Sequence, residues 1–275
     1  MSHAAPALTT ITVELSEGIA EIVLNRPQRS NAIDESMWYE LRTAFTWADS
    51  TPSVRVVILG GCGRNFCAGI DLAMLAGVAT AASHRDQARG REVLRRLILD
   101  LQNCLTTVER CRKPVLAAIQ GACIGGAVDL VTCCDMRYAA ADAQFAVREV
   151  DVGMTADVGT LQRLPRLIAD GVARELAYTG RTIDGSEAQR IGLVNQVFPT
   201  PEELREGVRR VARTIAAKSP LATRGTKEML NYGRDHSVAD GLNYVATWNA
   251  AMLLSADFEE AMAALSERRP PRFID

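Results

Sequence analysis

The chain has 275 residues, of which 48% are apolar and 23% charged, and this balance excludes disordered, collagen-like and coiled-coil proteins. Its 31 Lys and Arg against 33 Asp and Glu give a net charge of −2, so we expect no nucleic-acid or membrane partner. The length predicts one large domain or a domain with an appended segment.

The cysteines and histidines bear on compartment and metal content. Seven cysteines include no CxxC pair, and an odd number cannot close completely into disulfides, so we interpret them as reduced thiols. Residues 1–6 lack a signal-like pattern, and together these features predict a cytoplasmic protein. Three histidines without metal-ligand spacing predict no metal site.

The first two hundred residues alternate between strand-like and helix-like periods. Residues 10–25 alternate apolar and polar side chains around Glu17 and Gly18, which predicts a hairpin closed by a tight turn. Strand-length apolar runs and stretches of helical period then follow one another. Strands are predicted at 54–59 and 114–119, and helices at about 34–48, 85–110 and 127–133.

Beyond Pro199 the periodicity is helical throughout. Helices are predicted at 202–218, 220–234, 238–254 and 257–268. We therefore predict an α/β domain at residues 1–200 and a helical domain at 201–275. One apolar face of this segment predicts contact between subunits, and its members are Asn243, Trp248, Met252 and Leu253.

Two glycine-containing turns each follow an apolar strand, at residues 66–71 and 121–127. Glycine lets the backbone approach a ligand closely, and two facing backbone N–H groups would form an oxyanion hole. The alternative is that both turns serve close packing in an α/β body.

Three acids lie in apolar surroundings: Asp129 just after the second turn, then Glu149 and Asp157. Burial and like charge raise carboxyl pKa values, which leaves a protonated acid beside an ionised one, as proton transfer requires. The alternative is a structural role, in which these acids pair with Arg148 or Arg163 or cap a helix.

Three segments, residues 25–32, 66–72 and 121–135, carry a resemblance to the crotonase (enoyl-CoA hydratase/isomerase) superfamily. The sequence resembles this superfamily from about residue 10 to the C-terminus. Within it, residues 121–168 are similar to the Δ3,5-Δ2,4-dienoyl-CoA isomerases. The resemblance implies a β-β-α superhelix body with a C-terminal helical trimerisation domain, assembled as a homo-trimer or hexamer. It also implies isomerisation of 3,5-dienoyl-CoA to 2,4-dienoyl-CoA in fatty-acid β-oxidation, with no cofactor other than the CoA of the substrate.

The resemblance also implies residue roles. The backbone N–H groups of Ile70 and Gly126 would form the oxyanion hole. Glu149 and Asp157 would be the proton-shuttling pair, and Asp129 would complete the polar pocket. Substrate contacts would fall on Arg29, Ala32, Ala68, Gly69, Asp71, Leu72 and Ala127, with Arg268 contributed by a neighbouring chain.

Two other functions remain open. An enoyl-CoA hydratase of this superfamily uses two Glu at the positions of Asp129 and Glu149 to activate a water, whereas the first acid here is Asp. The shorter side chain would lie farther from that water, and Asp157 has no role in hydration. A non-catalytic acyl-CoA-binding protein is the other alternative, and three buried acids argue against it because an idle buried carboxylate costs stability.

Overall fold

The computed structural model describes residues 4–81 and 86–274, and two β-sheets organise them. In the six-stranded sheet the strand order is β1-β2-β3-β4-β6-β9, and in the three-stranded sheet it is β5-β7-β8. The first sheet contains β1 (Ile11–Ser16), β2 (Ile19–Leu24), β3 (Val56–Gly61), β4 (Val115–Ile119), β6 (Met136–Ala140) and β9 (Gln196–Phe198). The second contains β5 (Ala122–Ile124), β7 (Gln144–Ala146) and β8 (Ile183–Asp184).

The predicted hairpin is confirmed. β1 and β2 pair antiparallel, and Glu17 and Gly18 between them have φ values of 52° and 77°. Two consecutive left-handed residues are what a two-residue hairpin turn requires, and glycine adopts this conformation without steric cost. From β2 onward the strands of the large sheet are parallel, so each crossover needs a connecting segment.

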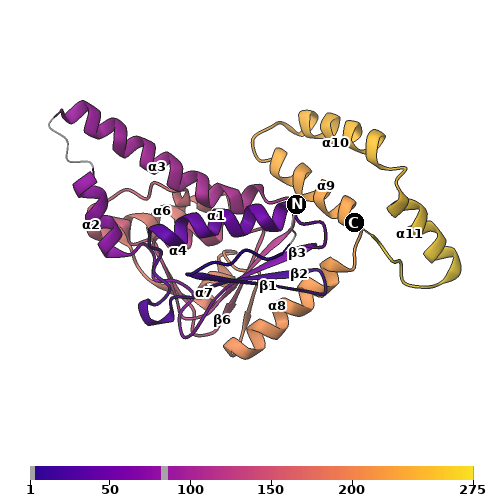
Figure 1. Ribbon diagram of the computed structural model, residues 1–275, viewed down its shortest axis with the longest axis horizontal. Helices are drawn as coiled ribbons and strands as arrows, with labels where there is room; N and C mark the ends of the chain where they lie inside the picture. The colour runs from indigo at the N-terminus through magenta and orange to yellow at the C-terminus, as the bar shows by residue number, and fades with distance from the viewer. Residues whose placement is uncertain (1–3, 82–85, 275) are drawn as a thin grey trace.

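Helices cover both faces of the large sheet. α1 (Glu35–Ser50) and α3 (Gln87–Arg110) pack together over one face, and α8 (Pro201–Ala216) lies across the other (Figure 1). In β3, Val57 and Leu59 join the core beneath α1 and α3, whereas Val56 and Ile58 join the core beneath α8. Burial on both faces explains why residues 54–59 form an unbroken apolar run.

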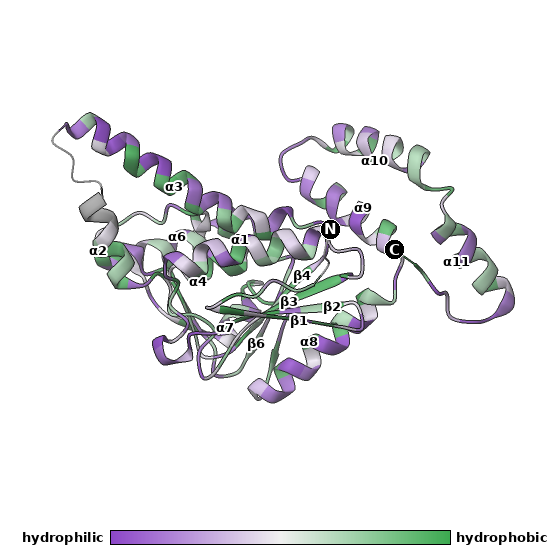
Figure 2. Ribbon diagram, viewed as in Figure 1, coloured by the Kyte–Doolittle hydropathy of each residue, from purple (hydrophilic) through white to green (hydrophobic). Residues whose placement is uncertain are grey.

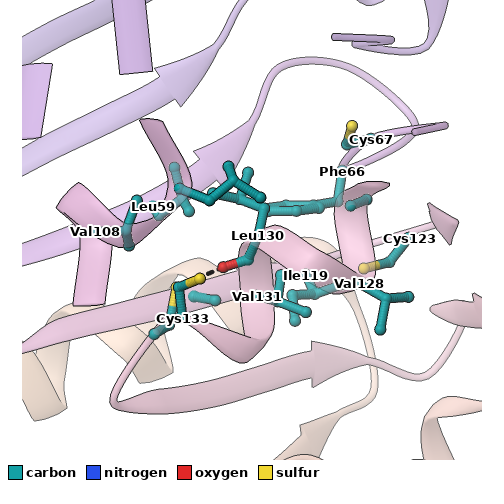
Figure 3. Packing of buried hydrophobic residues seen from close by; sticks show 14 of the residues in the cluster. Leu59, Phe66, Cys67, Val108, Ile119, Cys123, Val128, Leu130, Val131 and Cys133 are labelled. Atoms are coloured by element: carbon teal, nitrogen blue, oxygen red, sulfur yellow. Dashed lines mark hydrogen bonds between the residues drawn. The ribbon is translucent and has the colours of Figure 1, made fainter. Parts of the chain in front are cut away.

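The short helix α4 (Gly126–Thr132) runs inside the core, and all seven of its residues are buried. Figure 3 shows Leu130 and Val131 of α4 among Leu59, Phe66 and Ile119. A helix surrounded in this way can hold a polar side chain away from water at a fixed position.

The α/β class is confirmed, and the helices and strands that were predicted lie within a few residues of their expected bounds, except that residue 85, the expected start of one helix, lies outside the described residues. The remaining elements of the body are short, except for α2 and α6. They are η1 (Pro27–Arg29), α2 (Leu72–Ala81), η2 (Glu149–Val152), α5 (Thr160–Arg163), η3 (Leu164–Arg166), α6 (Asp170–Thr179) and α7 (Gly185–Arg190).

After α8, three helices lead away from the sheets (Figure 1): α9 (Pro220–Tyr232), α10 (Val238–Met252) and α11 (Ala256–Glu267). The division at residue 200 stays a prediction, and α8, which follows that point, packs on the sheet. The buried ammonium of Lys227 in α9 lies 2.6 Å from a carboxylate oxygen of Asp135, which ties α9 to the body.

We call residues 238–267, which comprise α10, α11 and the short link between them, the C-terminal arm. Trp248, expected at a subunit contact, is half-buried and packs on Gly225 of α9, where a Cβ would lie 2.6 Å from the indole nitrogen, and its contact with another subunit stays a prediction. Other apolar side chains of the arm stay uncovered within the chain, including Leu253 (53% exposed) and Leu254 (86% exposed), and Figure 2 shows hydrophobic segments along α10 and α11. Among the residues placed by the structure, no helix has both the length and the apolar character to cross a bilayer.

Candidate active site

The two glycine-containing turns meet side by side. The Cys67 amide donates to the Ala122 carbonyl at 2.9 Å, and the Ile124 amide donates back to the Cys67 carbonyl at 3.2 Å. Gly69 has a φ of 94°, and a Cβ there would lie 2.6 Å from the Ile124 carbonyl oxygen. The sequence therefore needs glycine at this point for both its conformation and its close approach to the second turn.

Two backbone amides are available where the turns meet. A Cβ built on Gly126 would lie 3.5 Å from the Ile70 nitrogen, and a Cβ built on Gly69 would lie 3.5 Å from the Gly126 nitrogen. Within the described residues, neither the Ile70 nor the Gly126 amide donates a hydrogen bond. Two adjacent unpaired N–H donors can stabilise negative charge on one oxygen.

The three acids form one electrostatic cluster, although they come from α4, η2 and the loop before α5. The pKa of Asp129 is raised to about 7, mainly by burial, with the charges of Glu149 and Asp157 acting in the same direction. The pKa of Glu149 is raised by burial and by the charge of Asp157, and burial also raises the pKa of Asp157. At neutral pH this cluster can hold protonated and ionised carboxyl groups together.

Two of these acids keep an unpaired oxygen. Asp129 Oδ1 accepts the Thr160 amide at 2.5 Å, but its Oδ2 is buried without a partner in the described structure, as is Glu149 Oε2. The arginines offered as structural partners are engaged elsewhere, since Arg148 pairs with Asp151 and Arg163 with Glu109. An unpaired buried carboxylate oxygen costs stability, which favours a chemical role over a structural one.

The raised pKa of Asp129 makes a prediction for stability. The folded protein resists ionisation of Asp129 until about pH 7, whereas the unfolded chain ionises near its ordinary value of 3.8, so rising pH favours unfolding between these values. Asp129→Asn keeps an oxygen for the Thr160 amide and removes this titration. We expect the free energy of unfolding of the variant, relative to wild type, to rise by on the order of a few kcal/mol between pH 4 and pH 8.

Urea denaturation at the two pH values measures this change. Glu149 and Asp157 titrate in both proteins, so their contributions largely cancel in the difference. A difference that stays constant with pH would show that Asp129 ionises normally in the folded protein.

The predicted substrate-binding residues before α2 are held together by backbone pairing. The Ala68 amide donates to the Ser30 carbonyl at 2.9 Å, and the Asp71 amide donates to the Ile33 carbonyl at 2.9 Å. This pairing brings the segment that contains Arg29 and Ala32 next to residues 68–71, which include Ile70. Leu72, the first residue of α2, follows directly and is 72% exposed.

Two other candidates do not share this backbone pairing. The Ala127 side chain is fully buried in the core around α4. Arg268 ends α11, on the arm that leaves the body (Figure 1), so within one chain it does not join the other candidates. A contact from Arg268 would have to come from a neighbouring copy, as expected.

A cavity of about 650 Å³ lies beside the loop that carries Asp157. Val158 and Gly159 line it, but none of the three acids does. Its other walls carry charged side chains that are already paired, such as Arg163 with Glu109. An aliphatic chain gains little from such walls, so we do not assign this cavity to the acyl group.

Two contacts in the site had not been predicted. The Thr160 amide holds Asp129, and Gln102 Nε2 of α3 donates to the backbone carbonyl of Asp157 at 2.6 Å. A backbone donor leaves no trace in the sequence, and a glutamine on a helix is too common to signal a role.

The chain matches the model of the Enoyl-CoA hydratase/isomerase family over residues 14–275. It is 47% identical to the peroxisomal Δ3,5-Δ2,4-dienoyl-CoA isomerase of Arabidopsis thaliana, over 97% of this chain and 96% of that protein. It is 44% identical to the mitochondrial human enzyme of the same name, over 91% of this chain and 77% of that protein. The crystal structure of an enoyl-CoA hydratase from Bacillus anthracis superposes with a TM-score of 0.87 at 33% identity, over 97% of this chain and 99% of that one. The chain belongs to the enoyl-CoA hydratase/isomerase (crotonase) family, and the resemblance found in its sequence is confirmed.

The prediction of a cytoplasmic protein is contradicted, because the Arabidopsis relative is named peroxisomal and the human relative mitochondrial. All seven cysteines are free, which fits a reducing environment. Unpaired thiols distinguish a reducing compartment from an oxidising one, but they do not distinguish the cytosol from an organelle interior.

Proposed function

We propose that this chain isomerises 3,5-dienoyl-CoA thioesters to 2,4-dienoyl-CoA in fatty-acid β-oxidation. The observation that carries the proposal is that the half-buried Asp157 and Glu149 and the buried Asp129 interact electrostatically and all have raised pKa values, so two proton-transferring groups and a third acid are available. The relatives at 47% and 44% identity, both named dienoyl-CoA isomerases, support the same reaction.

In the first step, the amides of Ile70 and Gly126 donate to the thioester oxygen. The carbonyl and the conjugated diene make the proton on C2 acidic, so a carboxylate can remove it while the two amides stabilise the dienolate oxygen. The electron pair of the broken C–H bond enters the conjugated system, and the CoA thioester stays intact.

In the second step, a protonated carboxyl group delivers a proton to C6, and the double bonds move to C2 and C4. C2 and C6 are four carbons apart, so two acids serve better than one. We assign this pair to Glu149 and Asp157 without specifying which removes the C2 proton, and Asp129 completes the polar pocket. Both steps are proton transfers, so we expect the reaction to need no added metal or redox cofactor.

Hydration of 2-enoyl-CoA is the second candidate function, favoured by the superposition on the Bacillus anthracis hydratase. Hydration would use Asp129 and Glu149 on a water, but the Thr160 amide already holds Asp129 Oδ1. It would also leave Asp157, which is half-buried and has a raised pKa, without a purpose. A non-catalytic acyl-CoA-binding protein would leave all three acids idle, and we rank it last.

Ultraviolet assays of the purified protein separate these functions. We expect rapid gain of 2,4-dienoyl absorbance with 3,5-octadienoyl-CoA and little loss of enoyl absorbance with crotonyl-CoA. The reverse pattern would make the protein a hydratase. Binding of octanoyl-CoA without turnover of either substrate would indicate the binding protein.

We also propose that the chain assembles as a homo-trimer or hexamer through the C-terminal arm, because Leu253 and Leu254 stay exposed in one chain. Replacing both with Glu should convert the assembly to monomers in size-exclusion chromatography with light scattering. The matched control is Val93→Glu on α3, which changes a similarly exposed apolar residue outside the arm and should keep the assembly. A wild-type protein that elutes as a monomer would contradict this assembly.

A further inference from the structure

The loop that carries Asp157 has no secondary structure of its own, so neighbouring elements must fix its position. Ala156 and Val158, on either side of Asp157, are both buried. Buried neighbours keep the loop against the body, but among the described residues no backbone–backbone hydrogen bond holds Asp157 itself. A shift of the Asp157 backbone would carry its side chain along, and proton transfer is sensitive to the position of the carboxyl group.

The residues just after Asp157 are held from two sides. The Arg163 guanidinium lies directly on Gly159, where a Cβ would come within 1.8 Å of Nη1. Glu109 of α3 holds that guanidinium at 2.8 Å and also pairs at 2.6 Å with Arg234, in the turn after α9. One residue further, the Thr160 amide donates to Asp129.

At Asp157 itself, the contact comes from Gln102 on α3. Its Nε2 donates to the Asp157 carbonyl at 2.6 Å, across 55 residues of sequence. This hydrogen bond ties the backbone of Asp157 directly to α3. We propose that Gln102 is a positioning residue: it fixes the Asp157 backbone so that the Asp157 carboxyl group points at the substrate carbon with which it exchanges a proton. This role rests on the proposed isomerase function.

The test compares two neighbouring substitutions on α3. Gln102→Met keeps the length of the side chain and removes the donor. The matched control is Asn103→Met, because Asn103 is exposed on the next position of the same helix. For Gln102→Met we expect kcat with 3,5-octadienoyl-CoA to fall roughly tenfold or more, with the affinity for octanoyl-CoA changed less than twofold. We also expect a shift in the pH dependence of kcat, and wild-type values for the control.

Each outcome decides the proposal. Wild-type kcat and pH profile in Gln102→Met would overturn it, and so would a parallel loss of kcat, octanoyl-CoA affinity and thermal stability, which marks a structural role. If Gln102→Met does not fold, Gln102→Glu has the same shape but presents an acceptor to the carbonyl when ionised, and it should show the same selective loss. A wild-type protein that does not isomerise the diene would overturn the proposed function itself and this role with it.

Discussion

Asp157→Asn should abolish isomerisation of 3,5-octadienoyl-CoA and leave any hydration of crotonyl-CoA unchanged. Asparagine has nearly the shape of aspartate but cannot accept or deliver a proton, and general acid–base groups contribute about 10²–10⁴-fold to rates. The side chain of Gln102 donates to the backbone carbonyl of residue 157, not to its side chain, so this hydrogen bond should persist in the variant and the loop should keep its position. Measured kcat should therefore fall by that factor, with KM nearly unchanged.

The matched control for this substitution is Asp151→Asn. Asp151 is an exposed acid of the neighbouring η2 segment and pairs with Arg148, so its loss removes a surface charge of the same sign. We expect near wild-type kcat for this control. An Asp157→Asn enzyme that isomerises at the wild-type rate would remove Asp157 from the proton shuttle and return the hydratase mechanism to first place.

Sequence periodicity predicted the helices and strands that are long enough to show a repeating pattern of apolar residues. The hairpin was predictable because its strands alternate apolar and polar residues around Gly18, which favours a left-handed turn, and α9 because its cap and its period agree. The small sheet was not predicted, because β8 has two residues and carries no period. Packing contacts were equally hidden: the apolar face that includes Trp248 could be predicted, but not the contact of Trp248 with Gly225 of the same chain.

In the site, too, some residues could be predicted from the sequence and others could not. An acid amid apolar neighbours indicates burial, so Asp129 and Glu149 could be identified as candidates before the fold was known. Their proximity to Asp157 could not be derived from spacing, because it depends on how the loop before α5 folds back on α4. Gln102 gave no signal at all, since its importance lies in one contact with a backbone atom.

Glu149→Gln should abolish both isomerisation and hydration, unlike Asp157→Asn. Glu149 transfers a proton in either mechanism, so the expected loss is again about 10²–10⁴-fold in kcat. A Cβ on Gly125 would lie 3.3 Å from Glu149 Oε1, which places this carboxyl group beside the turn that provides the Gly126 amide. Its Oε2 is buried without a hydrogen-bond partner in the described residues, so the amide substitution breaks no bond at that atom.

Glu175→Gln is the matched control, because Glu175 is exposed on α6 and pairs with Arg181 at the surface. Its loss should leave both activities near wild type, since exposed ion pairs contribute little to stability. Octanoyl-CoA should bind Glu149→Gln as tightly as wild type, because the oxyanion amides stay in place. Retention of either activity in Glu149→Gln would show that the remaining acids suffice for that reaction, and loss of isomerisation alone would assign hydration to a mechanism independent of Glu149.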